Sequence, residues 1–258
     1  MRIALSQFAA HTDTERNLEH IRTTVARLSD VDIVVFPEAA MARFGIPLGP
    51  LAEPLDGKWA TAVRQIAADA GVLIVAGMFT PSPDGRVTNT LLITGKGIDT
   101  HYDKIHLFDA FGFTESATVA PGSRTVVAEV DGVGVGFATC YDIRFPGLFQ
   151  KLADDGALVT IVPASWGSGP GKREQWELLV RARALDSTAW IVACGQAYPG
   201  DEVASKGPTG IGYSAVSSPL GEIREQLGQE PGLLIVDIDP DEALAARKTV
   251  PVLANRRF

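Results

Sequence analysis

Short apolar runs alternate with amphipathic stretches along the chain. Apolar runs of about four to eight residues are typical of strands buried on both faces of a sheet, and a 3.6-residue period is typical of helices. In the first half, strands are predicted at 2–8, 32–36 and 72–79, and a helix at 58–70. Residues 12–15 have capping-box spacing and predict a further helix that ends near residue 28.

The pattern changes in the middle of the chain. Segments 88–93 and 97–104 predict neighbouring strands, because the glycine-containing turn 94–97 joins them directly. Part of the sheet is therefore expected to be antiparallel. A long loop with Gly and Pro follows from 105 to 124, and a loop of that length in a compact domain is more often functional than not.

The second half repeats the alternation of strands and helices. Strands are predicted at 126–130, 133–139, 158–163, 190–196, 211–217 and 233–238, and helices at 145–155, at 172–188 and from 241 onward. Two such halves predict two α/β layers packed face to face. Because no Ser/Gly/Pro-rich linker divides the sequence, residues 1–258 are interpreted as one domain and 201–208 as a surface loop.

Composition favours a protein that binds a small molecule. The chain has 258 residues, of which 46% are hydrophobic, so it can bury a substantial core. Its 31 acidic residues outnumber 23 Lys and Arg, and the net charge of -8 argues against a nucleic acid or an anionic membrane as partner. The N-terminus turns polar too soon for a signal peptide, and no apolar run is long enough to span a bilayer. A cytosolic location is therefore expected.

Three predicted strands end on residues with chemically useful side chains. Glu38 follows the second strand, Lys104 ends the strand before the long loop, and Cys140 follows 133–139. A cysteine amidase needs these groups, because free cysteine has a pKa of about 8.5 and reacts at neutral pH only beside a base or a cation. The pattern thus predicts Cys140 as nucleophile, Glu38 as base and Lys104 as the cation.

The remaining cysteine and the histidines are weaker candidates. None of the four histidines stands at a strand end with an obvious partner; they are His11, His20, His101 and His106. Cys194 lies within an apolar strand and is interpreted as a core residue. Two cysteines fit a reducing compartment, and neither is paired with histidines at zinc-ligand spacing. Since the glycine-rich stretches 132–136 and 167–173 also lack nucleotide-binding spacing, no metal or cofactor is expected.

Three motifs carry a resemblance to a known family. Phe36-Pro37-Glu38, Tyr102-Asp103-Lys104-Ile105-His106-Leu107 and Cys140-Tyr141-Asp142-Ile143-Arg144-Phe145-Pro146 resemble the catalytic motifs of the nitrilase superfamily of carbon-nitrogen hydrolases in wording, order and spacing. The resemblance covers nearly the whole chain. It is strongest to the branch of omega-amidases and deaminated-glutathione amidases, on the third motif and on Gln175-Trp176-Glu177-Leu178-Leu179.

The resemblance implies a fold, an assembly and a reaction. The fold is a four-layer α-β-β-α sandwich with mixed sheets, and the assembly is a homodimer or a larger homo-oligomer. The reaction is hydrolysis of the carbon-nitrogen bond of a small carboxylate-bearing amide through a thioester, with release of ammonia and without a cofactor. Glu115 matches a second glutamate of the family, in the loop before the cysteine strand.

The family mechanism assigns a role to each reactive group. Glu38 takes the thiol proton, and Lys104 and the backbone N–H of Tyr141 stabilise the oxyanion. Glu115 orients Lys104 or the leaving amine. Replacement of Lys104 with Met is accordingly expected to abolish turnover and to leave the fold intact.

Substrate contacts are predicted around these groups. Arg144 stands where related amidases bind a substrate carboxylate, and a structural ion pair with Asp142 is its alternative role. The residues predicted to contact the substrate are Tyr141, Arg144, Phe111, Ala164, Ser165 and Trp166.

The chain departs from the amidase branch at three places: at Glu174, at 213–215 and at 109–112. These departures leave the substrate open. The alternatives are a nitrilase, an N-carbamoyl amino acid hydrolase, and a non-hydrolytic member of the fold that transfers acyl groups or binds a partner.

Overall fold

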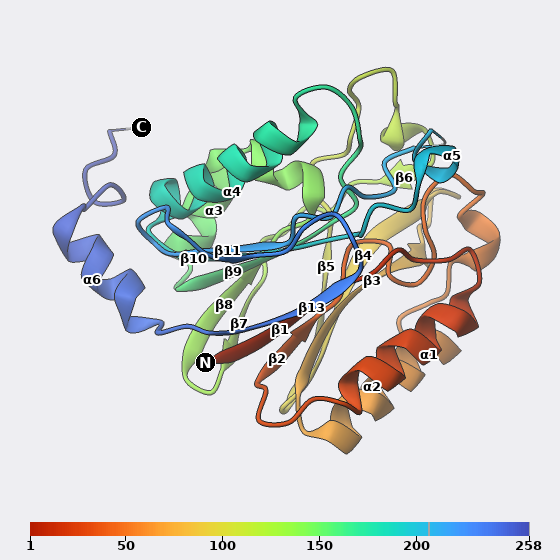
Figure 1. The fold of residues 1–258 in the computed structure, drawn as a ribbon, viewed down its shortest axis with the longest axis horizontal. Coiled ribbons are helices and arrows are strands. Elements are labelled where there is room, and N and C mark those ends of the chain that lie inside the picture. Colours follow the sequence, from red (N-terminus) through yellow and green to blue (C-terminus); the bar gives the residue numbers. More distant parts are fainter. Residues whose placement is uncertain (206, 258) are drawn as a thin grey trace.

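Two mixed β-sheets pack face to face, and each is covered on its outer face by helices (Figure 1). The structure is a computed structural model and describes residues 1–205 and 207–257. The layers follow each other as helices, sheet, sheet and helices, which confirms the predicted α-β-β-α sandwich.

The first sheet is built mainly by the first half of the chain. In spatial order, its strands are β13 (Gly232–Asp237), β1 (Arg2–Gln7), β2 (Ile33–Val35), β3 (Leu73–Pro81), β4 (Val87–Gly95) and β5 (Ile98–Asp103), and the short β6 (Val119–Ala120) pairs with β4. The strands β1, β2 and β3 run parallel. Strand β4 pairs antiparallel with β3 and with β5, and its pairing with β5 agrees with the turn predicted at 94–97. Helices α1 (Thr14–Val25) and α2 (Lys58–Ala70) cover its outer face (Figure 1).

The second sheet has parallel central strands with antiparallel strands at its edges. In spatial order, its strands are β12 (Ile223–Gln226), β11 (Ala215–Ser217), β10 (Trp190–Gly195), β9 (Val159–Ala164), β8 (Val133–Phe137) and β7 (Val127–Val130). Helices α3 (Pro146–Asp154) and α4 (Lys172–Ser187) cover it, and α5 (Asp201–Ala204) and α6 (Asp241–Thr249) follow later in the chain. Three 3₁₀ turns complete the described elements: η1 (Gly49–Leu51), η2 (Glu115–Ala117) and η3 (Cys140–Arg144).

Alternation along the strands explains the layered packing. In β1, Ile3 and Leu5 belong to the apolar cluster between the sheets, whereas Ala4 belongs to the cluster under α1 and α2. Successive side chains of a strand point to opposite faces, so a fully apolar strand serves two cores at once. The cluster between the sheets draws residues from both halves of the chain, so the two sheets share one core.

Some element boundaries differ from the predicted ones. Helix α1 is capped by Asp13, whose carboxylate accepts the N–H groups of Glu15 at 3.0 Å and Arg16 at 3.4 Å, so the predicted cap at Thr12 was wrong by one residue. Of the strand predicted at 211–217, only 215–217 forms. Strand β12 was missed because most of its residues are exposed and charged or polar, and α5 occupies four residues of the predicted loop 201–208.

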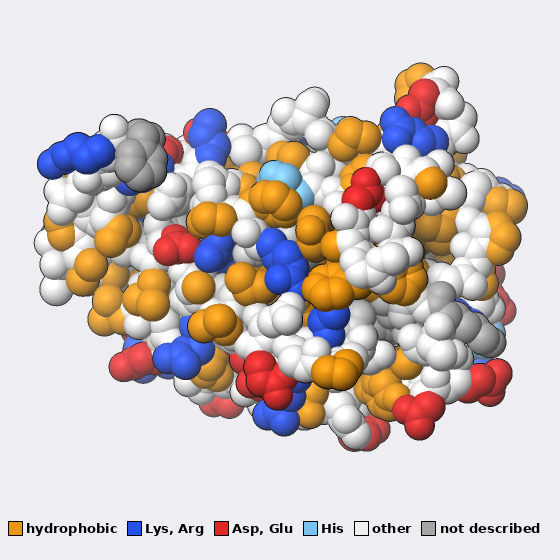
Figure 2. Space-filling view, turned by 90° about the horizontal axis from the view of Figure 1, so that it is seen from above, with side chains coloured by type: hydrophobic (Ala, Val, Ile, Leu, Met, Phe, Trp, Pro, Cys, Tyr) orange, Lys and Arg blue, Asp and Glu red, His pale blue; other side chains and the backbone are white. Residues whose placement is uncertain are grey.

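The surface carries charged side chains of both signs, as the counts of acidic and basic residues lead one to expect. Figure 2 shows Lys and Arg side chains interspersed with Asp and Glu over the face that it presents. Within the described part of the chain, no helix has the length and apolar character needed to cross a bilayer.

Candidate active site

Glu38, Lys104, Glu115 and Cys140 line one pocket of about 510 Å³. Glu38 lies just beyond the end of β2, Lys104 directly after β5, Cys140 beyond β8, and Glu115 in the long loop. Residues separated by up to 102 positions in the sequence thus meet where the strand ends of both sheets converge.

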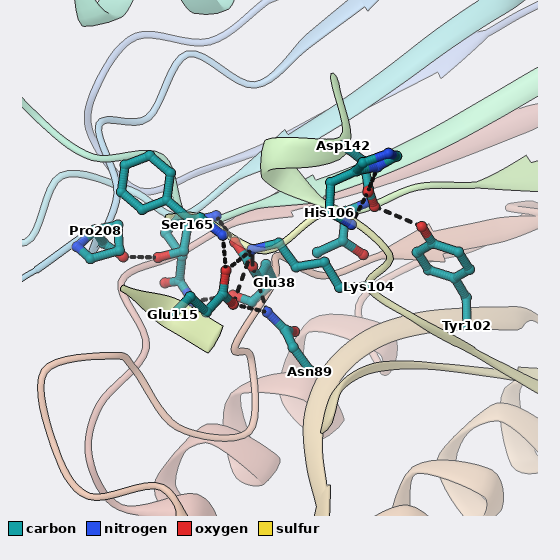
Figure 3. A network of polar contacts seen from close by, with 12 residues as sticks. Glu38, Asn89, Tyr102, Lys104, His106, Glu115, Asp142, Ser165 and Pro208 are labelled. Atoms are coloured by element: carbon teal, nitrogen blue, oxygen red, sulfur yellow. Dashed lines mark hydrogen bonds and ion pairs between the residues drawn. The ribbon is translucent and has the colours of Figure 1, made fainter. Parts of the chain in front are cut away.

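Lys104 lies between the two glutamates (Figure 3). Its Nζ is 3.0 Å from Oε1 of Glu38 and 2.8 Å from Oε2 of Glu115, and all three side chains are buried. Burial alone would lower the pKa of Lys104, but the charges of the two carboxylates outweigh it and raise the pKa above its ordinary value. Lys104 therefore keeps its positive charge at neutral pH and lines the pocket as a buried ammonium group.

The other contacts of Glu38 hold its carboxylate rigidly. Oε2 accepts the backbone N–H of Ser165 at 2.7 Å, and Gln196 donates its side-chain amide to the Glu38 carbonyl at 2.9 Å. The backbone of Gly77 in β3 passes directly beneath, where a Cβ would lie only 2.5 Å from the nitrogen of Ala39. Only glycine fits this close approach, so Gly77 helps to place the Glu38 carboxylate.

Cys140 begins η3 in a strained backbone conformation, with φ of 47°. The left-handed region costs a non-glycine residue roughly 1–2 kcal/mol, so the surrounding structure must hold it there. Asp142 does so, because its carboxylate accepts the N–H of Thr139 at 2.8 Å and its own N–H bonds to the Thr139 carbonyl at 3.0 Å. The thiol is thus presented on a sharp turn into the pocket.

The Asp142 carboxylate is fully buried and receives further donors (Figure 3). Tyr102 donates its hydroxyl at 2.7 Å, and the backbone N–H and Nδ1 of His106 lie at 2.9 and 2.8 Å. The prediction that no histidine has an obvious partner was therefore wrong for His106. Its partner comes from a distant strand end, which local sequence does not reveal.

The surroundings of Cys140 favour the protonated thiol. Burial, followed by the charge of Glu38, raises its pKa well above the ordinary value, and Lys104 opposes this only in part. A raised pKa keeps the thiolate fraction small at neutral pH, so a nearby base is needed for the sulfur to react, and the Glu38 carboxylate is a candidate for it.

Alkylation of the resting enzyme should reflect this protonation. We expect iodoacetamide to inactivate the protein slowly at neutral pH, with a rate that keeps rising through about pH 9, because only the scarce thiolate reacts and its fraction grows about tenfold per pH unit below the pKa. Inactivation rates measured across this range, with Cys140→Ala to identify the labelled site, test the prediction. A plateau near pH 7 would contradict it.

Asn89 is a site residue that sequence reasoning missed. From β4 it donates its side-chain amide to Oε1 of Glu38 at 2.7 Å and to Oε1 of Glu115 at 3.2 Å (Figure 3). It is a neutral donor between two carboxylates that share one ammonium. The available signal was an asparagine in a mostly buried strand, where a buried amide needs a polar partner.

Replacing Asn89 with Leu should lower kcat/KM about 10- to 150-fold per folded molecule, because a hydrogen bond to a charged group contributes about 1.5–3 kcal/mol. Thr94→Val is the matched control, since Thr94 is also buried in β4 and does not line the pocket. Asn89 could support turnover or only the stability of the fold, and kinetics corrected for the folded fraction separate these two roles. An unchanged kcat/KM would show that it only stabilises the fold.

Four of the six predicted substrate contacts line the pocket: Tyr141, Arg144, Ser165 and Trp166. Ser165, however, uses its N–H for Glu38 and its hydroxyl for the Pro208 carbonyl, so neither group is free for a substrate. Ala164 is fully buried in the core of the second sheet, behind the pocket wall.

Phe111 also lies outside the main pocket. It is 63% exposed and lines a neighbouring hollow, whereas Phe108 and Phe113 line both this hollow and the pocket. The sequence 108–113 contains three phenylalanines, and only the loop conformation decides which of them faces inward.

Two cations stand at one end of the pocket. Arg144 packs over Trp166, with 4.9 Å from guanidinium carbon to ring centroid, and donates to Gln175 at 2.7 Å, whereas its Nε is buried without a partner. The predicted alternative, an ion pair with Asp142, is not formed, because Asp142 bonds to other groups.

Lys172 is the second cation. It lies over the ring of Phe111, and burial followed by the charge of Arg144 lowers the pKa of Lys172. Among the described residues, no carboxylate pairs with either cation, so this end of the pocket favours an anionic ligand.

Comparison with known proteins gives matches along nearly the whole chain. The family model described as carbon-nitrogen hydrolase matches residues 2–248. A hydrolase of Mycobacterium tuberculosis is 55% identical over 99% of this chain and 95% of its own length. The deaminated glutathione amidase of Escherichia coli O157:H7 is 34% identical over 100% of this chain and 98% of its own. The crystal structure of an amidase from Nesterenkonia sp. superimposes with a TM-score of 0.83 at 26% identity, over 100% of this chain and 93% of that one.

Proposed function

The chain belongs to the carbon-nitrogen hydrolase family, and on this basis we propose that it is an amidase that cleaves a small carboxylate-bearing amide through a thioester on Cys140. One observation carries the proposal: a buried Glu38-Lys104-Glu115 network lies in the same pocket as a cysteine on a strained turn.

The first half-reaction forms the thioester. Sγ of Cys140 attacks the amide carbon while Glu38 accepts the thiol proton. The oxyanion is stabilised by the ammonium of Lys104 and by the N–H of Tyr141, which forms no backbone hydrogen bond within the described residues. Each such donor contributes on the order of 100- to 1000-fold in rate. The carbon-nitrogen bond then breaks, and Glu38 returns the proton to the departing nitrogen.

The second half-reaction hydrolyses the thioester. Glu38, ionised again, takes a proton from water as the water attacks the acyl carbon, and the carbon-sulfur bond breaks with return of that proton to the thiol. Glu115 holds Lys104 through both carboxylate oxygens, at 3.1 and 2.8 Å, so the ammonium stays in place during both steps.

A solved relative supports the nucleophile. In a glutamate-to-leucine variant of the Nesterenkonia amidase, the acetamide moiety of fluoroacetamide is added covalently at the active-site cysteine. That protein is 25% identical to this chain, over 100% of this chain and 94% of its own, with a TM-score of 0.83.

Arg144 and Lys172 support a substrate that carries a carboxylate. Replacing Arg144 with Gln should raise KM for such an amide about 10- to 150-fold, because it removes a charge-assisted hydrogen bond. A neutral amide of the same length is the control and should show little change in KM. The variant Arg144→Lys keeps the positive charge but lacks the planar guanidinium that donates two parallel hydrogen bonds. Equal losses with charged and neutral amides would exclude carboxylate recognition by Arg144.

The experiment that tests the function is a substrate panel with ammonia or amine release as readout. It contains omega-amides of 2-oxo acids, deaminated glutathione, N-carbamoyl amino acids and nitriles, each with wild type and Cys140→Ala. Release from a carboxylate-bearing amide that is lost in the variant supports the proposal. Preference for a nitrile or an N-carbamoyl amino acid selects one of the alternative hydrolases, and no release at all favours acyl transfer or partner binding.

We also propose that the chain forms a homodimer or a larger homo-oligomer. Leu178 and Leu185 lie seven residues apart on one face of α4 and are 65% and 48% exposed, and hydrophobic side chains are visible on the face drawn in Figure 2. Sedimentation velocity measures the oligomeric state, and a stable monomer would contradict the proposed homo-oligomer. A cytosolic location stays a prediction from the sequence.

A further inference from the structure

The pocket is lined by two groups of residues of different chemistry, together with Cys140. One group is cationic and aromatic, with Tyr141, Arg144, Trp166 and Lys172. The other group, which we call the apolar arm, consists of apolar side chains of the 44–48 segment and of two strands; these are Phe44, Ile46, Leu48, Val87 and Val119.

The apolar arm is a packed part of the protein. Val87 and Val119 are 5% and 1% exposed and form one cluster with Ala39, the neighbour of Glu38. Phe44 and Leu48 pack against this cluster from the loop side. The arm therefore begins directly beside the catalytic base.

Among the residues that the structure describes, no unpaired charge lines the apolar arm. Arg86 lies in its wall, but two of its guanidinium nitrogens bond to Asp84 at 2.9 and 2.6 Å. The third donates to the carbonyls of Ser116 and Val119 at 2.9 and 3.1 Å. Arg144 and Lys172 in the cationic group have no such carboxylate partner within the described residues, so a ligand's charge belongs there and its apolar part in the arm.

The pocket is large enough for a substrate with substituents on both sides of the amide. Its volume is about 510 Å³, within the range of roughly 300–1,000 Å³ that encloses drug-sized ligands.

The position of Glu38 decides which part of the substrate enters the apolar arm. The leaving nitrogen must lie beside the group that protonates it, and the arm opens beside Glu38 and continues from Glu115 through 117–119. We propose that the apolar arm holds the substituent on the leaving nitrogen, so that the enzyme hydrolyses N-alkyl or N-aryl amides of carboxylate-bearing acids and releases an apolar primary amine. This rests on the proposed function. The carbon-nitrogen bond breaks, Glu38 protonates the amine, and water supplies the hydroxyl of the acid product.

The test compares kcat/KM for the primary, N-methyl, N-butyl and N-benzyl amides of one dicarboxylic acid monoamide. We expect a rise of about fourfold per methylene from N-methyl to N-butyl, as for burial of apolar groups. The ratio of N-butyl to primary amide should fall at least tenfold in Leu48→Trp, which fills the arm, and in Leu48→Asp, which makes it polar. Leu220→Trp is the matched control, because Leu220 is 54% exposed and lies outside the pocket, and it should leave the ratio unchanged.

The possible failures are distinguishable. Hydrolysis of the primary amide without any gain for N-butyl, or an N-butyl ratio that does not respond to either Leu48 variant, overturns the inference and leaves the proposed function standing. Faster cleavage of an N-acyl amino acid with an apolar acyl chain, sensitive to Leu48, would overturn the assignment of the arm to the leaving group. No hydrolysis of any of these amides would overturn the proposed function itself.

Discussion

Replacing Cys140 with alanine should lower kcat/KM by a factor on the order of 10⁴ to 10⁶, as loss of the nucleophile does in other hydrolases. The reason is that the proposed mechanism relies on Cys140 as the side chain that gives its proton to Glu38 and attacks the amide. Alanine adopts the φ of 47° at a cost similar to that of cysteine, so stability should change by no more than about 1 kcal/mol.

Steady-state kinetics and thermal unfolding of the same samples measure both effects. Cys194→Ala is the matched control, because Cys194 is a second buried thiol that donates to the Val35 carbonyl at 3.4 Å, between the sheets. We expect this control to lose stability and to keep its kcat. A Cys140→Ala protein with more than about a hundredth of wild-type activity would exclude Cys140 as the nucleophile.

Replacing Lys104 with Met should lower kcat/KM about 100- to 1000-fold and destabilise the fold by about 3–5 kcal/mol. The loss of rate follows from the lost oxyanion donor. The loss of stability follows because Glu38 and Glu115 would remain buried without their shared cation. The expectation from sequence that the fold stays intact is thereby revised.

A double variant separates the two effects of Lys104. Lys104→Met combined with Glu115→Gln removes one buried carboxylate together with the cation, so urea unfolding should show most of the stability restored. Turnover should stay low, since the donor to the oxyanion is still missing. Activity of Lys104→Met above a tenth of wild type would exclude the proposed role of the ammonium.

The sandwich and its reactive groups were accessible from sequence because each is marked within a few residues. The apolar run of β2 signals a strand buried on both faces, and Glu38 stands directly beyond it. The motif around Cys140 likewise marks a turn after a strand. Strand β12 carries no such signal, because its exposed residues bury almost no apolar surface.

The contacts among these groups depended on the tertiary structure. Asn89 reaches Glu38 and Glu115 from β4, and His106 reaches Asp142 across the two sheets, at separations between 26 and 51 residues. The position of Phe108 in the pocket in place of Phe111 follows from loop conformation, and the proximity of Arg144 to Lys172 follows from the packing of η3 against α4. Hydrophobic periodicity reports how a segment buries its own side chains, whereas a hydrogen bond or a pocket wall depends on the distance between segments, which only the packed fold establishes.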